Sequence, residues 1–328
     1  MKISFFCHID RAELLNLIDF YNQDIKILKE IDPDMKIATR FNEIDWNADV
    51  IYIWWWTYAF YPVIKAKLKN KKVVITGTFN YRCPGVDRDY FKRPLWQQKI
   101  IKYATRFADK NIMVSKKEMN EISADWHFNN FIYLPHCVDT AKFCPSKEGI
   151  RKDYLFTICG LDSLSVERKC LYELIEAIDI FKKKGEKIKL VIAGRKSNAF
   201  DDVKAYIQHH NLCDEIELIG EISEKEKIKR LQECKCYVQP SRYEGFGLAI
   251  AEAMSCGCYI LSSDVGEVSN VVGDSGVLLK QMDAQSIADG LEQLLMKRGN
   301  NESARFQVIN KFSIERRRKE LHQILNSL

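Results

Sequence analysis

The feature of this sequence that most constrains its fold is a regular alternation of two kinds of segment. Short apolar segments rich in Val and Ile, typical of buried strands, recur along the chain, and amphipathic segments with helical periodicity lie between them. The strand candidates include KISFF, DVIYIWW, KVVIT, YLFTIC, IKLVIAG and CYVQP, and the helix candidates include AELLNLIDFY, RPLWQQKIIKYATRFA and ERKCLYELIEAIDIFKKKG. This order predicts right-handed βαβ units and a mostly parallel sheet, twice over. The predicted fold class is α/β, with two doubly wound domains facing a cleft.

The length of the chain and one polar segment predict where the two domains meet. The 328 residues suffice for two hydrophobic cores of ordinary size. The segment KFCPSKEGIRKD combines Pro, Gly and clustered charge, so we expect the first domain at 1–148 and the second to begin at 149. Ligands of doubly wound sheets bind outside the carboxyl ends of the strands. The loops after YLFTIC, IKLVIAG and CYVQP are therefore the expected site.

Composition indicates a folded, cytosolic protein with a basic first half. Hydrophobic residues make up 46% and charged residues 29% of the chain. No apolar run is long enough for a membrane span, and MKISFFCHIDRAELL lacks the features of a signal peptide. Residues 1–150 carry 23 Lys and Arg against 18 Asp and Glu. This excess suggests a negatively charged partner, such as an anionic membrane surface or a phosphorylated acceptor, and no motif indicates nucleic acid.

The eleven cysteines are scattered without a C-x-x-C pair, which is typical of a reduced cytosolic protein. Two C-x-C pairs occur, Cys234 with Cys236 and Cys256 with Cys258. They are interpreted either as zinc ligands or as buried thiols. No His partner stands at a familiar ligand spacing, so buried thiols are favoured and no metal is expected.

The loop PSRYEGFG carries the strongest functional signal. Ser241 lies at the end of a predicted strand, and Gly245 and Gly247 permit tight turns and close approach of a ligand to the backbone. A helix that begins near Gly247 presents free N–H groups suited to an anion such as a diphosphate. Glu244 and Glu252 stand on either side of this turn, where two carboxylates can bind hydroxyl groups on different parts of one extended ligand.

The block QPSRYEGFGLAIAEAMSCGCYILSSDVGEVSNVV resembles the donor-binding signature of the retaining glycosyltransferases of the GT-B fold, family 4 or group 1. The pattern is E-x7-E, from Glu244 to Glu252. Weaker similarities are ICGLDSLSVERKCLYELIEA, YLPHCVDTAKFCP and FSIERRRKELHQIL. The resemblance covers residues 110–328 well. It implies an acceptor-binding Rossmann-like domain at 1–148, a nucleotide-sugar-binding one at 149–310, and a C-terminal helix at 311–328 that packs back on the first domain.

The resemblance also implies roles for individual residues. Glu252 would bind the ribose of the donor nucleotide. Glu244 would bind the donor sugar, with Lys169 and Arg168 neutralising the diphosphate as it leaves. The other expected donor contacts are Gly245, Phe246, Gly247, Leu248, Ser241, Gly160 and Arg195. The implied reaction is metal-independent, retaining transfer from a nucleotide sugar, with UDP-sugar favoured, to a glycan or lipid-linked acceptor in surface polysaccharide, lipopolysaccharide or glycoconjugate synthesis.

The chain departs from the family pattern at several positions. Leu161 follows Gly160 where the family often has Arg, and Arg195 is the candidate replacement. Cys170 stands in place of a glycine, and Thr78 lies near the place of a family His. Two alternatives therefore stay open, a non-catalytic or diverged protein that binds nucleotide sugar and a nucleotide-sugar epimerase.

Two further segments have both a structural and a membrane interpretation. Trp54, Trp55 and Trp56 are expected to be buried at least in part, and a membrane contact is the alternative. The basic run IERRRKE is expected to form a solvated helix face, and the alternative is peripheral contact with anionic lipid.

Overall fold

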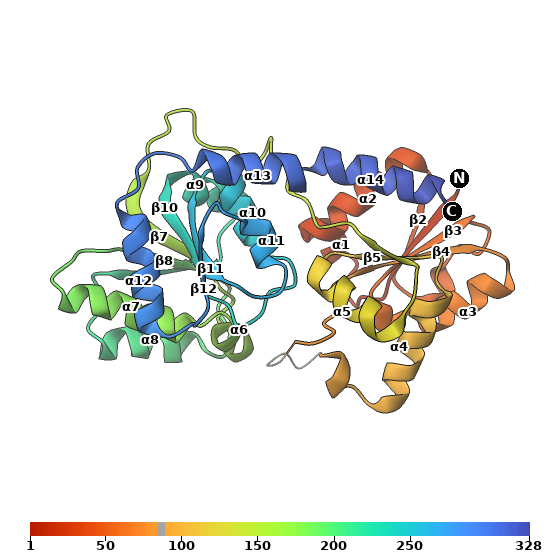
Figure 1. Ribbon diagram of the computed structural model, residues 1–328, viewed down its shortest axis with the longest axis horizontal. Helices are drawn as coiled ribbons and strands as arrows, with labels where there is room; N and C mark the ends of the chain where they lie inside the picture. The colour runs from red at the N-terminus through yellow and green to blue at the C-terminus, as the bar shows by residue number, and fades with distance from the viewer. Residues whose placement is uncertain (84–88) are drawn as a thin grey trace. The chain divides into compact units, whose positions relative to one another are not determined.

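The computed structural model describes residues 1–83 and 89–328, and the chain divides into two compact units. Unit 1 comprises 1–137 and 314–328, and unit 2 comprises 138–313. Each unit is a parallel six-stranded sheet with helices on both faces (Figure 1). This is the α/β fold with two doubly wound domains that the sequence predicts.

The sheet of unit 1 has the strand order β2-β1-β3-β4-β5-β6. Its strands are β1 (Ile3–Cys7), β2 (Lys36–Ala38), β3 (Val50–Trp54), β4 (Lys72–Gly77), β5 (Lys110–Met113) and β6 (Phe131–Tyr133). Its helices are α1 (Leu14–Leu17), α2 (Asp19–Ile31), α3 (Phe60–Leu68), α4 (Leu95–Phe107), α5 (Lys116–Trp126) and α14 (Ile314–Asn326), with short 3-10 turns η1 (Phe41–Glu43), η2 (Trp56–Tyr58) and η3 (Tyr90–Lys92). One hydrophobic core lies under α3, α4 and α5, and a second lies under α2 and α14.

The sheet of unit 2 has the order β12-β11-β10-β7-β8-β9. Its strands are β7 (Lys152–Ile158), β8 (Leu190–Ala193), β9 (Ile216–Gly220), β10 (Cys234–Gln239), β11 (Tyr259–Ser263) and β12 (Val277–Leu279). Its helices are α6 (Ser163–Arg168), α7 (Leu171–Lys183), α8 (Phe200–His209), α9 (Glu224–Glu233), α10 (Leu248–Ser255), α11 (Val268–Val272), α12 (Ala284–Leu295) and α13 (Glu302–Phe312). Helices α7, α8 and α12 cover one face, and α9, α10, α11 and α13 cover the other.

The boundary between the units lies earlier in the chain than residue 148. The backbone N–H of Val138 donates to the carbonyl of Phe312 at 2.8 Å, and Val138 also pairs with Ser313. Phe143 is buried in the core of unit 2. Residues 138–148 are therefore held by the second sheet and its helices, and the second crossing falls after Ser313 instead of after residue 310.

Helix α14 packs beside α2 in unit 1 (Figure 1). Arg317 is 2% exposed, and its guanidinium donates to both carboxylate oxygens of Asp24 at 2.7 and 2.9 Å. The same guanidinium donates to the carbonyls of Leu134 and Pro135. A buried charge pair costs much less when its remaining hydrogen bonds are satisfied, as they are here.

The segment predicted as one helix, ERKCLYELIEAIDIFKKKG, is two helices. Helix α6 ends at Arg168, Cys170 adopts a left-handed conformation with φ of 48°, and α7 begins at Leu171. The break turns Arg168 and Lys169 out of the long helix and leaves them beside the ends of β7 and β10.

Burial of the aromatic and cysteine residues confirms two structural interpretations. Trp54 and Trp56 are 0% and 4% exposed, and the four thiols of the two C-x-C pairs are fully buried. No group of His, Cys, Asp and Glu suited to a metal ion occurs among the described residues. In the same part of the chain, none of the helices has both the length and the apolar character needed to span a bilayer.

Candidate functional site

The candidate site of unit 2 lies where its strand order reverses. Strand β7 is followed by β8 and β9 on one side, whereas β10 is followed by β11 and β12 on the other. The loops that leave two neighbouring strands in opposite directions open a crevice at their carboxyl ends. The loop 159–162 follows β7 and the loop 240–247 follows β10, so both predicted loops meet at this position.

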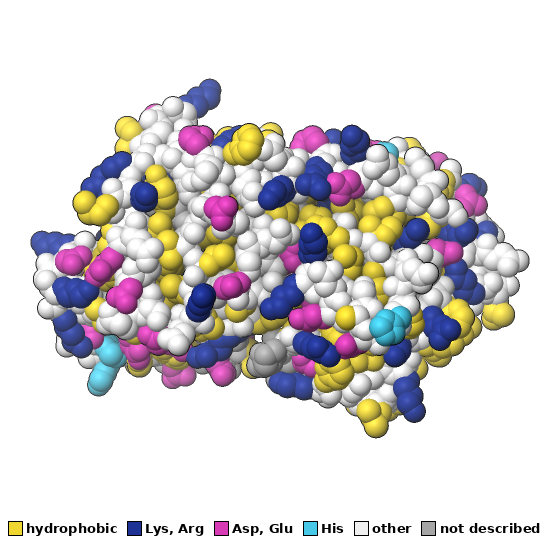
Figure 2. Space-filling view, viewed as in Figure 1, with side chains coloured by type: hydrophobic (Ala, Val, Ile, Leu, Met, Phe, Trp, Pro, Cys, Tyr) yellow, Lys and Arg dark blue, Asp and Glu magenta, His cyan; other side chains and the backbone are white. Residues whose placement is uncertain are grey.

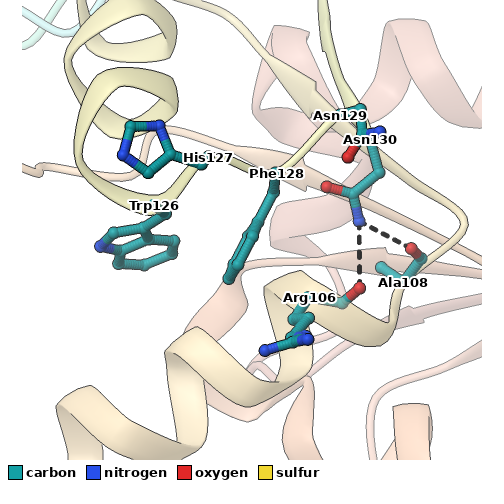
Figure 3. Close-up of a pocket in the computed structure, with 7 residues that line it drawn as sticks. All are labelled: Arg106, Ala108, Trp126, His127, Phe128, Asn129 and Asn130. Atoms are coloured by element: carbon teal, nitrogen blue, oxygen red, sulfur yellow. Dashed lines mark hydrogen bonds between the residues drawn. The ribbon is translucent and has the colours of Figure 1, made fainter.

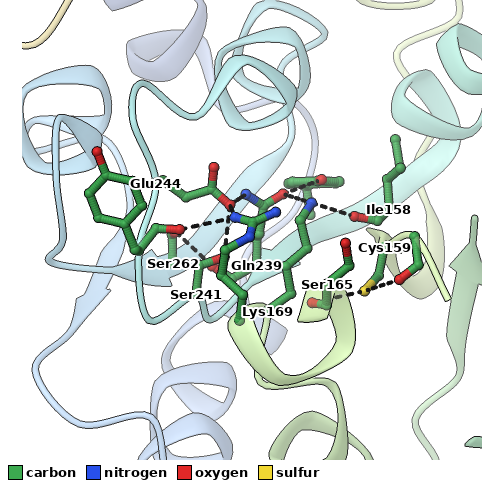
Figure 4. Close-up of polar contacts among 12 residues, drawn as sticks. Ile158, Cys159, Ser165, Lys169, Gln239, Ser241, Glu244 and Ser262 are labelled. Atoms are coloured by element: carbon green, nitrogen blue, oxygen red, sulfur yellow. Dashed lines mark hydrogen bonds and ion pairs between the residues drawn. The ribbon is translucent and has the colours of Figure 1, made fainter. Parts of the chain in front are cut away.

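Glu244 is the centre of a polar network at this edge (Figure 4). Its Oε1 accepts from Arg168 at 2.8 Å, from the Gln239 amide at 2.8 Å and from the Ser241 hydroxyl at 3.0 Å. The Glu244 side chain is 14% exposed and that of Arg168 is 33% exposed. The site can therefore be reached from solvent while its carboxylate is held in one orientation.

Lys169 lies on the other side of Gln239 (Figure 4). Its ammonium donates to the Ile158 carbonyl at 2.7 Å and to Gln239 Oε1 at 3.3 Å. An ammonium has three hydrogens, so these two acceptors leave one donor for a ligand oxygen. Burial lowers the pKa of Lys169, and the negative charge of Glu244 opposes that shift in part. A desolvated cation of this kind interacts strongly with an incoming anion.

Gln239 is the residue that sequence reasoning missed. Besides its contacts to Glu244 and Lys169, its Oε1 accepts from Tyr237 at 2.7 Å and its backbone carbonyl accepts from Ser262 at 2.8 Å. A polar residue as the last member of the buried strand β10 was the available signal, because buried polar side chains need partners.

The turn before α10 has a positive φ at one of its two glycines, Gly247. Gly247 has φ of 86° and directly precedes the helix, which begins at Leu248 without a side-chain cap. The first N–H groups of α10 are thus unused by a cap and suit an anion. Phe246 is 4% exposed and packs in the core against Phe312, so its side chain anchors the turn.

Gly266, in the loop after β11, was also missed. It has φ of 55°, and a Cβ there would lie 1.8 Å from the carbonyl oxygen of Glu244. Only glycine permits this approach, so the loop after β11 fixes the backbone of Glu244 from the far side.

Glu252 lies apart from this network. It is 3% exposed on α10, and its two oxygens receive the Lys227 ammonium of α9 at 3.0 and 2.9 Å. A role in binding hydroxyl groups would require Lys227 to share or release that carboxylate. Lys227 therefore joins the residues that sequence reasoning did not identify.

Two further candidates lie on the loops after β7 and β8. Gly160 is in the first of these loops, and Arg195 is exposed in the second. The Leu161 N–H donates to the Arg195 carbonyl at 3.1 Å, which joins the loops. Within the described part of the chain, no side-chain hydrogen bond or ion pair of Arg195 is found, so the structure does not bring its guanidinium into the Glu244 network.

Arg242 ties the site to the break between α6 and α7. Its N–H donates to the Arg168 carbonyl at 2.7 Å, and its guanidinium donates to Glu173 at 2.6 Å. Both contacts hold Arg168 and Lys169 against the loop after β10.

A separate pocket of about 490 Å³ lies in unit 1, between the end of α4 and the turn after α5 (Figure 3). It is lined by Arg106, Ala108, Trp126, His127, Phe128, Asn129 and Asn130. The Asn130 amide donates to the carbonyls of Thr105 and Ala108 at 2.8 Å, so it closes the end of α4. The Asn130 side chain in this pocket thus bonds to nearby backbone carbonyls. The catalytic and donor-binding residues predicted from the sequence lie in unit 2.

Comparisons with known proteins show which family and which fold this chain resembles. Residues 153–310 match the family described as glycosyl transferases group 1. The chain is 25% identical over 263 residues to one of the subunits of phosphatidylinositol N-acetylglucosaminyltransferase from Arabidopsis thaliana, covering 73% of this chain and 58% of that protein. It is 29% identical over 251 residues to an uncharacterized glycosyltransferase of Methanocaldococcus jannaschii, covering 76% and 65%. The chain thus spans less than two thirds of the length of these relatives.

Among solved structures, Anabaena HepE in complex with UDP superimposes over 100% of both chains, with a TM-score of 0.81 and 16% identity. The chain therefore has the fold of the GT-B glycosyltransferases. The segment that matches the glycosyl transferases group 1 family, residues 153–310, lies within unit 2.

Proposed function

We propose that the protein is a retaining glycosyltransferase that moves a sugar, without a metal, from a nucleotide sugar to a glycan or lipid-linked acceptor. The acceptor would belong to surface polysaccharide, lipopolysaccharide or glycoconjugate synthesis. The observation that carries this proposal is the Glu244 network at the switch point of unit 2, with Lys169 beside it and the uncapped start of α10 after it.

Each part of the network suits one part of a nucleotide sugar. Breaking the bond between sugar and diphosphate leaves negative charge on the phosphate oxygens. Fixed cations and helix N-termini stabilise that charge in the transition state. Lys169 has a hydrogen available for this contact, and Arg168 can exchange its bond with Glu244 for a phosphate oxygen.

Glu244 has a second oxygen, Oε2, besides the one that accepts the three hydrogen bonds described above. Oε2 can accept a hydrogen bond from a sugar hydroxyl, because the three hydrogen bonds to Oε1 hold the carboxylate in one orientation. We assign the donor sugar to Glu244 and the ribose to Glu252, with Lys227 moving from Glu252 when the nucleotide binds. Acceptor contacts are assigned to unit 1, and a cytoplasmic location at the membrane surface is part of the proposal.

The nucleotide is tested first by calorimetric titration with UDP and, separately, with GDP, in the absence of metal. We favour UDP because the structure of Anabaena HepE, which has the same fold, is a complex with UDP. Binding of UDP supports the donor site. If neither nucleotide binds, the departures at Leu161 and Cys170 have removed the site, and the transferase proposal fails.

Transfer is tested with the variant Glu244→Ala and its matched control Glu186→Gln. Glu186 is exposed just before β8, at the opposite end of the sheet. Loss of a group that orients charge in the transition state lowers turnover by about 10²–10³-fold. We expect that loss of turnover only in Glu244→Ala, and its melting temperature should be unchanged. The transfer reaction should give an α-configured product from an α-configured donor, which NMR measures. Full activity of Glu244→Ala would contradict the assignment. Conversion of the donor without any acceptor would indicate an epimerase.

A further inference from the structure

One part of unit 1 has an unusual charge composition. Residues 56–83 and 90–107 together contain eleven Lys and Arg and no Asp or Glu. Residues 1–150 as a whole carry 18 acidic residues, so the basic excess of the first half is concentrated in these two segments. They include α3 and α4, which pack side by side on one face of the sheet.

The same two helices expose large apolar side chains. Trp96 is 64% exposed and Tyr103 and Phe107 are 42% and 45% exposed, and these residues follow one stripe of α4. Leu95 at the start of α4 and Leu68 at the end of α3 are 73% and 81% exposed. The rings of Tyr103 and Phe60 of α3 lie 5.4 Å apart, which joins the two helices into one surface. In Figure 2, hydrophobic and dark-blue side chains lie next to one another over the region that α4 occupies in Figure 1.

Basic side chains lie along one side of the apolar stripe of α4. Lys99, Lys102 and Arg106 are exposed along the helix. Within the described residues none of the three has an ion pair, although Lys102 and Arg106 lie over the rings of Trp126 and Phe128.

Acidic residues from outside the two segments pair with other cations of the segments. Asp109 pairs with Lys67 and Lys72, and Asp125 pairs with Arg82. The three cations of α4 are therefore among those that these acidic neighbours leave uncompensated.

We propose that this α3–α4 face, made of Leu68, Leu95, Trp96, Lys99, Lys102, Tyr103, Arg106 and Phe107, docks the protein on a bilayer that contains anionic lipid. A helix with one apolar stripe that includes Trp, flanked by Lys and Arg, lies in the interfacial plane of a membrane. The apolar side chains enter the boundary of the acyl chains, and the cations contact the headgroup phosphates.

The charge and the apolar side chains of this surface distinguish a bilayer from two other possible partners, a second copy of the chain and nucleic acid. A symmetric dimer through the same face would bring two strongly basic surfaces together, at a cost in repulsion. Nucleic acid would be bound by the cations and the rings, but the exposed Leu68 and Leu95 have no part in stacking on bases. A bilayer uses the aliphatic, aromatic and basic residues together.

The surface differs from the two membrane candidates apparent in the sequence. Trp54 and Trp56 are buried. In the basic run of α14, Arg317 is buried against Asp24, and Arg316 and Arg318 pair with Glu320 and Glu30. The buried tryptophans and the paired arginines of α14 therefore have structural roles.

The test is co-sedimentation of the full chain with vesicles of phosphatidylcholine, with and without about one third phosphatidylglycerol. The wild type should bind the anionic vesicles, and the binding should weaken as salt is raised. Each cation near an anionic surface contributes about fivefold to partitioning. Lys99→Glu/Lys102→Glu should thus lower binding by at least about tenfold, and Trp96→Ser by at least about fivefold through lost apolar area.

The matched control is Lys311→Glu/Lys319→Glu, which reverses two exposed charges on α13 and α14. Binding and melting of the control should stay within twofold and one degree of the wild type. Four results would overturn the inference: no binding of anionic vesicles by the wild type, equal loss in the control, loss of self-association in Trp96→Ser measured by ultracentrifugation, or binding to an oligonucleotide instead of vesicles. The inference is independent of sugar transfer. Glu244→Ala should keep vesicle binding, and Lys99→Glu/Lys102→Glu should keep UDP binding.

Discussion

The two units have the same kind of sheet, yet different kinds of side chain lie at the ends of their central strands. In unit 2 the switch point between β7 and β10 holds Glu244, Gln239 and Lys169. In unit 1 the switch point lies between β1 and β3, and the Trp54 ring at the end of β3 stacks on His136, with Phe20 against both. Burial and the charge of Arg317 hold the pKa of His136 well below its usual range, so this ring stays neutral.

This difference shows that the fold sets the place of a site, but the loop residues decide whether the place is used. Rings that pack on one another fill the edge of unit 1 and stabilise it. Charged groups at the edge of unit 2 cost free energy unless they are paired or bind a ligand. We therefore expect substitutions of the buried groups in unit 1 to act on stability, and substitutions of the side chains in the Glu244 network of unit 2 to act on binding.

The largest effect is expected for Arg317→Leu in unit 1. The substitution leaves Asp24, which is 0% exposed, as an uncompensated buried charge, so unfolding should cost about 3–5 kcal/mol less. All six tryptophans lie in unit 1, so urea unfolding followed by tryptophan fluorescence reports this unit. Arg318→Ala, which removes a surface pair with Glu30, should change stability by less than about 1 kcal/mol. A similar loss of stability in both variants would mean that the buried pair of Arg317 and Asp24 contributes no more than the surface pair of Arg318 and Glu30.

The second effect is expected for Gly266→Ala in unit 2. A Cβ there meets the Glu244 carbonyl, so the loop must move, at a cost of about 3 kcal/mol together with the strain of its positive φ. Gly185 has φ of 78° with no atom within 4 Å of its Cβ position. Gly185→Ala should therefore cost only about 1–2 kcal/mol. Urea unfolding followed by circular dichroism measures both, and UDP titration should show weaker binding for Gly266→Ala alone.

A smaller effect, on binding, is expected for Gln239→Ala. Lys169 and Glu244 each lose a partner, so the affinity for UDP should fall about tenfold, which corresponds to about 1.4 kcal/mol. Gln285→Ala, in a surface contact with Asp289, is the control. Unchanged affinity in Gln239→Ala would mean that the network does not orient the cation for the nucleotide.

The smallest effect is a pH dependence from Lys169. Its pKa is lowered by burial, so the cation is lost at a lower pH than for an exposed lysine, and UDP affinity should decrease as pH rises through that value. Stability should change in the opposite direction over the window between the lowered pKa and the ordinary value of 10.5, because the unfolded state holds more protons there. In Lys169→Arg the guanidinium stays charged, and calorimetry should show a flatter pH profile for binding.

Much of the fold is readable from the sequence because its strands are short, apolar and separated by clear amphipathic helices. Each of the strand segments discussed above, from KISFF to CYVQP, is a strand in the structure. The break at Cys170 was missed because a single left-handed residue inside an amphipathic pattern leaves the periodicity intact. Helices α11 and α13 were missed as well, the first because it has only five residues and the second because its exposed face carries Phe306 and Ile309.

Prediction of the site was limited by what a local motif contains. The block around PSRYEGFG identified Glu244, Ser241 and the glycine turn, and the segment ICGLDSLSVERKCLYELIEA identified Arg168 and Lys169. The structure brings these residues together. Gln239, Gly266 and Lys227 depend on contacts between strands or helices far apart in sequence. The same holds for Glu252, whose pairing with Lys227 is formed only when α9 and α10 pack.

The path of the chain has a consequence for synthesis on the ribosome. Unit 2 is one continuous stretch, whereas unit 1 is closed by its last fifteen residues, and Arg317 meets Asp24 across a separation of 293 residues. Domains normally fold in the order in which they are translated. Here residues 1–137 of unit 1 are translated before unit 2 and α14 after it, so unit 2 can complete its own sheet before α14 leaves the exit tunnel. The nascent chain thus carries an unfinished sheet of unit 1 while unit 2 is translated, and truncation within α14 should leave that sheet open to proteases.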